Sequence, residues 1–368
     1  TMGGEPTFIA VDDPDGAEWN TAALGAEKRK RALALFARLQ QHYAPLGLVH
    51  FGQGKWYPGE PLPRWSLNCF WRADGVPIWQ RRELLADESQ DLGADATLAE
   101  RFLHALGSRL GMSAENLFPA FEDRFYYLWR EHQLPINVDV SASQIADPLE
   151  RARLMRVFLQ GLDAVVGQVL PLTYLDGAWR SSAWFLRSEQ CFLVPGDSPL
   201  GYRLPLSSQP WARAEDRPMI HEGDPAQEPV SLEQSRTSDA EAAAPERRPP
   251  TGAEAAAQAR RRPEAQESAK DIVRTALCAQ PREGRLYLFL PPLEKLPEFL
   301  ELIAAIEATA AELSTPVILE GYEPPADARL KVFRVTPDPG VIEVNIHPGA
   351  SWAELVERTQ IGHPEAAS

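Results

Sequence analysis

The sequence has little cysteine and no long apolar run, and each shortage excludes a class of protein. Its three cysteines, Cys69, Cys191 and Cys278, lie far apart. An odd number of cysteines without metal-ligand spacing argues against a disulfide framework or a structural zinc site. No window approaches the roughly 18 uninterrupted apolar residues that a membrane-spanning helix needs. We therefore expect three buried thiols in a soluble cytoplasmic protein that has no membrane partner.

Positive charge is also scarce. The chain has 37 Lys and Arg against 52 Asp and Glu, which gives a formal net charge of -15. A chain this acidic repels nucleic acid and anionic lipid, and its globular regions contain no basic stripe. The GxSxG, HExxH and CxxC motifs and the Walker A spacing are absent as well. Nucleic-acid binding is thus not expected, and a hydrolase is the least favoured class of enzyme.

Composition divides the chain into segments. Residues 1–211 are rich in aromatic side chains, and residues 270–358 return to a globular composition. Residues 212–269 between them hold Ala, Glu, Arg, Pro and Ser with almost no large apolar side chain, a composition that cannot offset chain entropy by burial. We expect a disordered linker inside one discontinuous domain, followed by a tail at 359–368. Both ends are abrupt, so we expect the chain to be part of a longer protein.

Hydrophobic periodicity places the main elements of an α+β fold. The pattern predicts helices near 26–43, 97–110, 147–166 and 297–313, and strands at 8–11, 65–71, 286–290, 316–319, 330–335 and 341–347. The tight turn before Val341 favours an antiparallel pair. The expected architecture is therefore an antiparallel sheet with a helix layer, not a doubly wound sheet.

The strand expected at 341–347 carries the clearest functional signal. Side chains alternate between the two faces of a strand, so Glu343, Asn345 and His347 share the face opposite a row of aliphatic residues. Glu343 and His347 would lie roughly 13 Å apart, too far to bind one ion together. A carboxylate, a carboxamide and an imidazole on one face suit a polar site along a groove. A solvated outer face explains the same pattern, although Asn is a poor strand former.

Other candidates are single residues. Glu5 and Glu320 are acidic, and Glu320 comes at the end of a strand, where a carboxylate suits Mg²⁺. Lys55 lies in a Gly-flanked loop of the kind that holds phosphate. Arg64 and Arg203 are of a type that pairs with carboxylate or phosphate. For each residue alone, an ordinary surface or structural role is the more common explanation.

Several longer motifs resemble a known bacterial domain family. They are TMGGEPTF (1–8), DGAEWNTAALG (15–25), GQGKWYPGEPLPRW (52–65), PGDSPLGYRLPL (195–206), EGYEPPADARLKV (320–332) and VTPDPGVIEVNIHP (335–348). The chain is similar along both globular segments to a family assigned to the amidoligases, a domain of unknown function within the glutamine-synthetase-like superfamily. In long bacterial proteins that domain follows a transglutaminase-like domain.

The resemblance implies a fold and a set of roles. The fold would be a curved, mainly antiparallel sheet with helices packed on one face, incomplete in this chain because family members continue beyond it. Mg²⁺ and ATP would bind on the concave face, with Glu5 and Glu343 as metal ligands. Glu320 joins them as a metal candidate because of its place at a strand end. By the same likeness, Glu343, Asn345 and His347 match the polar catalytic strand. The remaining candidates, Lys55, Arg64 and Arg203, would contact phosphate or substrate.

Two functions follow from the resemblance. In the first, the protein is an ATP- and Mg-dependent ligase that joins a carboxylate to a peptide or small amine through an acyl phosphate. In the second, it is a non-catalytic module that binds peptide substrates for a transglutaminase-like domain of the parent chain. A ligase needs the Glu343 face and Glu5 to converge, whereas a binding module tolerates them apart.

Overall fold

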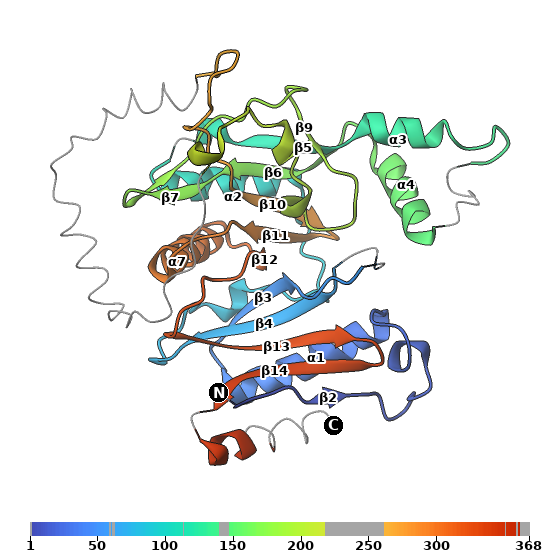
Figure 1. The fold of residues 1–368 in the computed structure, drawn as a ribbon, viewed down its shortest axis with the longest axis vertical. Helices are drawn as coiled ribbons and strands as arrows, with labels where there is room; N and C mark the ends of the chain where they lie inside the picture. The colour runs from blue at the N-terminus through green and yellow to red at the C-terminus, as the bar shows by residue number, and fades with distance from the viewer. Residues whose placement is uncertain are drawn as a thin grey trace.

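One large sheet runs through the molecule, and both globular segments contribute strands to it (Figure 1). The computed structural model describes residues 2–58, 60, 63–112, 114–139, 147–217, 261–349, 351–357 and 360. The sheet has 12 strands in the order β1-β14-β13-β4-β3-β12-β11-β10-β6-β5-β9, with β2 also paired to β14. In chain order the strands are β1 (Met2–Gly4), β2 (Thr7–Phe8), β3 (Leu48–Gln53), β4 (Trp65–Arg72), β5 (Phe118–Glu122), β6 (Val165–Pro171), β9 (Cys191–Leu193), β10 (Ala276–Arg282), β11 (Arg285–Leu290), β12 (Val317–Gly321), β13 (Leu330–Asp338) and β14 (Val341–Gly349).

Most neighbouring strands are antiparallel. The parallel pairs are β11 with β12, β12 with β3, and β5 with β9. A separate hairpin joins β7 (Thr173–Leu175) to β8 (Ala178–Arg180). The helices are α1 (Ala26–Tyr43), α2 (Ala96–Arg109), α3 (Arg124–Glu131), α4 (Pro148–Gln160) and α7 (Leu296–Leu313). The prediction of an α+β fold with a mainly antiparallel sheet is thus confirmed, including the antiparallel pair of β13 and β14.

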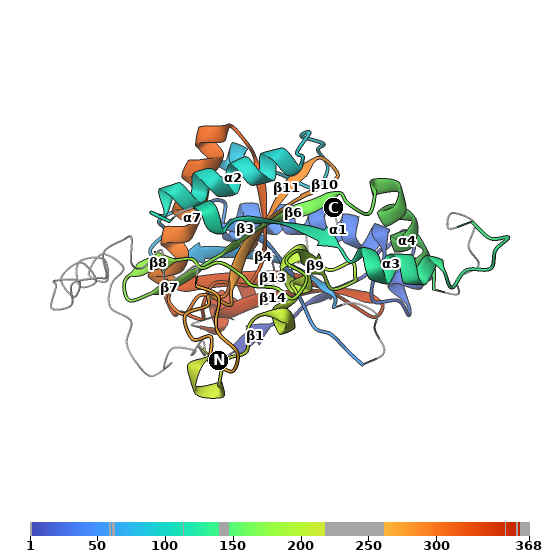
Figure 2. The same ribbon diagram turned by 90° about the horizontal axis from the view of Figure 1, so that it is seen from above.

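Helices cover both faces of the sheet, so the expectation of helices on one face only is wrong. Phe36 and Leu39 of α1 pack on Phe333 and Val344, in a core beneath the β4–β13–β14 part of the sheet. A second core joins α2 and α7 to aliphatic residues of β6, β10 and β11. Strand register assigns these two cores to opposite faces, because the residues that point to one core alternate along the strands with those that point to the other. Figure 2 shows α2 and α7 together at one side, away from α1.

Two predicted elements have different bounds, for local reasons. The helix expected over 147–166 ends at Gln160, because Gly161 takes a φ of 95° and caps it through the Val157 carbonyl. The β-branched run that follows joins the sheet as β6. The strand expected at 8–11 is only Thr7–Phe8, since Ile9 and Val11 are exposed.

The predicted linker is described only at its two ends. Residues 218–260 and most of the predicted tail at 359–368 lie outside the described residues. At the described ends, the Ala269 amide donates to the Trp211 carbonyl at 3.0 Å, and the Arg213 amide donates to Ser268 Oγ at 3.0 Å. These bonds bring the chain on either side of the gap together before it enters β10. Within the described parts of the chain, no helix is long and apolar enough to cross a membrane.

Candidate active site on the polar face of the sheet

Polar side chains form two rows across neighbouring strands on one face of the sheet. In the first row, Thr7 of β2 pairs with Glu343 of β14, which pairs with Thr336 of β13. In the second row, residues of β14, β13, β4 and β3 pair in turn: Asn345, Arg334, Asn68 and His50. We call these seven residues, together with Ser66, the polar face. Ile342, Val344 and Ile346 alternate with them and are buried under α1, as predicted.

Glu343 is the centre of the first row. It is 8% exposed, and its Oε2 lies 3.6 Å from Lys55 Nζ and 3.4 Å from Thr336 Oγ1. The Asn345 amide donates to the same Thr336 hydroxyl at 3.5 Å. The Lys55 side chain is 56% exposed, so its ammonium reaches a nearly buried carboxylate from the solvent side. The row therefore offers one carboxylate, several neutral oxygens and one cation within a short span.

A connected network of hydrogen bonds fixes the second row. Asn68 donates to Glu323 Oε1 at 3.1 Å and lies 3.3 Å from His50 Nδ1, while the Ser66 hydroxyl donates to Asn68 Oδ1 at 2.5 Å. Arg334 donates to Glu323 Oε2 at 2.6 Å. His50 is fully buried, and this burial lowers its pKa to about 4. The imidazole is consequently neutral at pH 7. The hydrogen bonds between Ser66, Asn68, Glu323 and Arg334 hold the row in one arrangement.

Two further residues were predicted on this face, Glu5 and His347. Glu5 is exposed and follows Gly4, which pairs with Ile346, so its backbone runs beside β14 close to Asn345. His347 packs edge-on against Trp71, with ring centroids 5.0 Å apart. The structure thus places Glu343 and Asn345 around Thr336, and His347 against an aromatic ring.

The two predicted phosphate-binding arginines are engaged elsewhere. Arg64 is buried, donates to Glu60 at 2.7 Å, contacts Asp338 and lies 4.4 Å from the Tyr57 ring centroid. These contacts tie its loop to the end of β13.

Arg203 donates to the Val194 carbonyl at 2.8 Å and to Glu122 at 3.1 Å, with both side chains of the ion pair under 10% exposed. Breaking such a buried pair is costly, so its place in the fold is structural.

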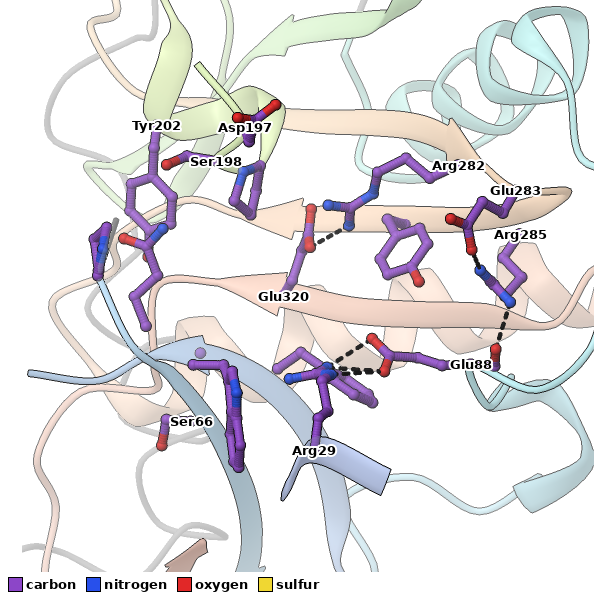
Figure 3. A pocket seen from close by; sticks show the side chains of 17 residues that line it. Arg29, Ser66, Glu88, Asp197, Ser198, Tyr202, Arg282, Glu283, Arg285 and Glu320 are labelled. Atoms are coloured by element: carbon purple, nitrogen blue, oxygen red, sulfur yellow. Dashed lines mark hydrogen bonds and ion pairs between the residues drawn. The ribbon is translucent and has the colours of Figure 1, made fainter. Parts of the chain in front are cut away.

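Glu320 lies on the other face of the sheet, in the wall of a cavity of about 500 Å³ (Figure 3). It is 3% exposed and contacts Arg282. Gly321, the next residue, has a φ of 100° and sits against the Leu290 backbone, so a larger residue there would shift the end of β12. Glu320 and Glu343 therefore belong to separate sites.

Sequence reasoning found Glu343 and Asn345 but missed the other six residues of the polar face. Ser66 and Asn68 alternate with apolar residues inside the strand expected at 65–71, which is the same signal that singled out Glu343. His50 falls in a stretch for which we predicted no strand. Only the register of β3 against β4 shows that His50 faces Asn68.

Comparison with family models covers the whole chain. Residues 1–368 match the family described as "Putative amidoligase enzyme (DUF2126)", and the chain belongs to that family. Searches of curated proteins and of solved structures gave no significant match. The class of protein is thus defined by the family, and the roles of individual residues must come from the geometry of the chain itself.

Proposed function

We propose that the protein is a carboxylate–amine ligase that uses ATP and Mg²⁺, with its reaction centre on the polar face. The observation that carries the proposal is the Glu343–Thr336–Lys55 cluster, beside the Asn345–Arg334–Asn68 row, in a member of an amidoligase family. Such a cluster supplies oxygen ligands and a cation on a rigid sheet, which is what phosphoryl transfer requires of a protein.

The oxygen ligands of the polar face fit Mg²⁺ only if phosphate oxygens of the nucleotide and water complete its shell. Among the described residues, no group of three His, Cys, Asp or Glu side chains is placed to hold a metal ion. Glu343 offers one carboxylate next to the Thr336 hydroxyl and the Asn345 amide. Mg²⁺ commonly takes one or two protein carboxylates and completes its shell with water and phosphate oxygens. Glu343, with Glu5 from the neighbouring segment, would hold the ion, and the ion would offset charge on the phosphates.

The proposed reaction has two steps. A carboxylate oxygen of the acid substrate attacks the γ-phosphorus of ATP, which forms an acyl phosphate and releases ADP. The amine then attacks the acyl carbon, loses a proton, and expels phosphate to leave an amide. Lys55 would steady the phosphate charge as a point cation, and Arg334, fixed by Glu323, would present its guanidinium to an anionic group of the acid.

Acid- and amine-dependent ADP release tests the proposal. The protein is incubated with Mg-ATP and pairs of acids and amines, starting with the standard L-amino acids and short peptides. We expect ADP release only when both partners are present, together with an amide product of matching mass. A folded protein that binds peptides but releases no ADP with any pair would instead support a binding module that serves a transglutaminase-like domain.

A further inference from the structure

The cavity that contains Glu320 lies across the sheet from the polar face. Phe51 follows His50 in β3 and Trp65 precedes Ser66 in β4, so the aromatic side chains point away from the polar face. Glu320 pairs with Phe51 and shares its face. Arg29 of α1 and residues of the segment from Asp197 to Tyr202 also line the cavity (Figure 3). Ser66 is the one described residue of the polar face that also lines the cavity, whereas Glu343 and Thr336 do not. The cavity is therefore a site separate from the proposed reaction centre.

Charges of both signs line the cavity in nearly equal number. The lining holds four carboxylates, Glu88, Asp197, Glu283 and Glu320, and three guanidiniums, Arg29, Arg282 and Arg285. Each guanidinium already contacts a carboxylate of the lining: Arg29 with Glu88 at 2.7 Å, Arg282 with Glu320, and Arg285 with Glu283. A triphosphate would bring additional negative charge against these carboxylates, so the cavity is a poor nucleotide site.

In the Arg282–Glu320 ion pair, each partner keeps one polar atom that makes no hydrogen bond to a described residue. Oε1 of Glu320 and Nε of Arg282 are buried and have no hydrogen-bond partner among the described residues. Both groups are held in place, since Arg282 stacks over the Tyr287 ring with 3.5 Å to the centroid and Glu320 is 3% exposed. Burial raises the pKa of Glu320. A buried, unsatisfied acceptor beside an unsatisfied cationic donor is costly unless something binds there.

We propose that this cavity binds a zwitterionic amine of amino-acid size. The ligand's ammonium donates to Glu320 and its carboxylate accepts from Arg282, so each unused atom gains a partner of opposite charge. The ligand as a whole adds no net charge to a lining that is already close to balance. Asp197 does not compete for the ammonium, because Arg153 and Arg156 bind it at 2.5 and 2.8 Å.

The rest of the lining suits the side chain of such a ligand. Phe51, Trp65, Tyr202 and Tyr287 contribute aromatic surface beside the charged pair. Aromatic rings offer a large apolar surface, and their faces also attract cationic groups. A volume of about 500 Å³ falls in the range of roughly 300–1,000 Å³ typical of small-molecule sites. The cavity therefore has room for an amino acid with a large side chain or for a dipeptide.

Calorimetric titration in the absence of ATP tests the site without relying on ligase activity. The standard L-amino acids are titrated singly, and the tightest binder is then compared with its N-acetyl and carboxamide forms. We expect both derivatives to bind at least roughly tenfold more weakly, the loss that follows when one charge-assisted hydrogen bond is removed. This comparison uses the unmodified protein and is independent of any folding defect in a variant.

Two variants test whether Glu320 binds the ammonium of the ligand and Arg282 its carboxylate. Glu320→Gln should weaken the free amino acid at least roughly tenfold while leaving its N-acetyl form unchanged or tighter, because Arg282 then lacks a counter-charge. Arg282→Gln should show the mirror pattern with the carboxamide form. Glu343→Gln, on the opposite face, should bind the free amino acid like the unmodified protein. Circular dichroism and thermal unfolding establish that each variant is folded.

Three results would overturn the proposal. One is the absence of binding by any amino acid at about 10 mM, far above a specific dissociation constant. Another is amino-acid binding that neither Glu320→Gln nor Arg282→Gln changes. The third is tight binding of inorganic phosphate or ATP that Arg282→Gln abolishes, which would make the cavity a phosphate site. Amino-acid binding without ADP release would leave this proposal standing and refute the ligase instead.

Discussion

The polar face and the cavity lie on opposite sides of one sheet and differ in how their charges are paired. On the polar face, Glu343 and Lys55 lie 3.6 Å apart and the ammonium side chain is 56% exposed, so the charges stay accessible to a ligand. In the cavity, each guanidinium is already matched to a carboxylate and aromatic rings form the walls. The first arrangement suits a phosphate group and an ion, and the second suits a ligand that carries both charges.

The largest effect on the free energy of unfolding is expected at the buried ion pair of Arg203 and Glu122. Arg203→Met removes the partner of Glu122 inside the protein and should lower the free energy of unfolding by about 3–5 kcal/mol. Urea denaturation measures the loss. Arg81→Met is the control, since its pair with Glu83 is largely exposed and should contribute under about 1 kcal/mol. Equal, small losses in both variants would mean that Arg203 is free for ligand binding, as the sequence suggested.

The next effect is a pH dependence of stability that His50 gives to the polar face. Its pKa is lowered from 6.5 to about 4 when the chain folds. Between these values the unfolded chain binds a proton that the folded chain does not, so stability falls as pH drops through this window. The loss should reach about 3 kcal/mol by pH 4. Urea midpoints measured against pH should fall less steeply in His50→Gln, and parallel curves would contradict a buried neutral imidazole.

Glu343→Gln tests whether the polar face contains the reaction centre. The substitution keeps the shape of the side chain but removes the charge, and we expect ATP turnover to fall at least roughly 100-fold with the fold unchanged. ADP release is the measurement, and Glu312→Gln, which changes an exposed partner of Arg109, is the matched control. Turnover equal to that of the unmodified protein would remove Glu343 from the reaction centre.

The smallest effect is expected at Lys55. Because its side chain is 56% exposed, Lys55→Met should change stability by less than about 0.5 kcal/mol. The KM for Mg-ATP should nevertheless rise several-fold as the phosphate loses a point cation. Steady-state kinetics at varied ATP detects this change. An unaltered KM would indicate that the nucleotide does not reach this end of the polar face.

Sequence reasoning recovered the polar face better than the cavity, for a physical reason. Alternation within one strand is local, so the pattern around Glu343 predicted which side chains leave the core. The cavity brings together Arg29, Glu88, Arg282 and Glu320, from four separate segments of the chain, and no local pattern relates them. The same limit applies to Arg203, whose burial depends on Glu122, 81 positions away in the chain.

Oxygen-18 transfer tests the central claim most directly. An acid substrate labelled in its carboxylate is incubated with the unmodified protein, Mg-ATP and an amine that supports ADP release, and the phosphate product is analysed by mass spectrometry. The account predicts that one labelled oxygen reaches each phosphate, because the carboxylate oxygen that attacks the γ-phosphorus leaves with it. Amide formation with unlabelled phosphate would contradict an acyl phosphate and the ligase mechanism proposed for the polar face.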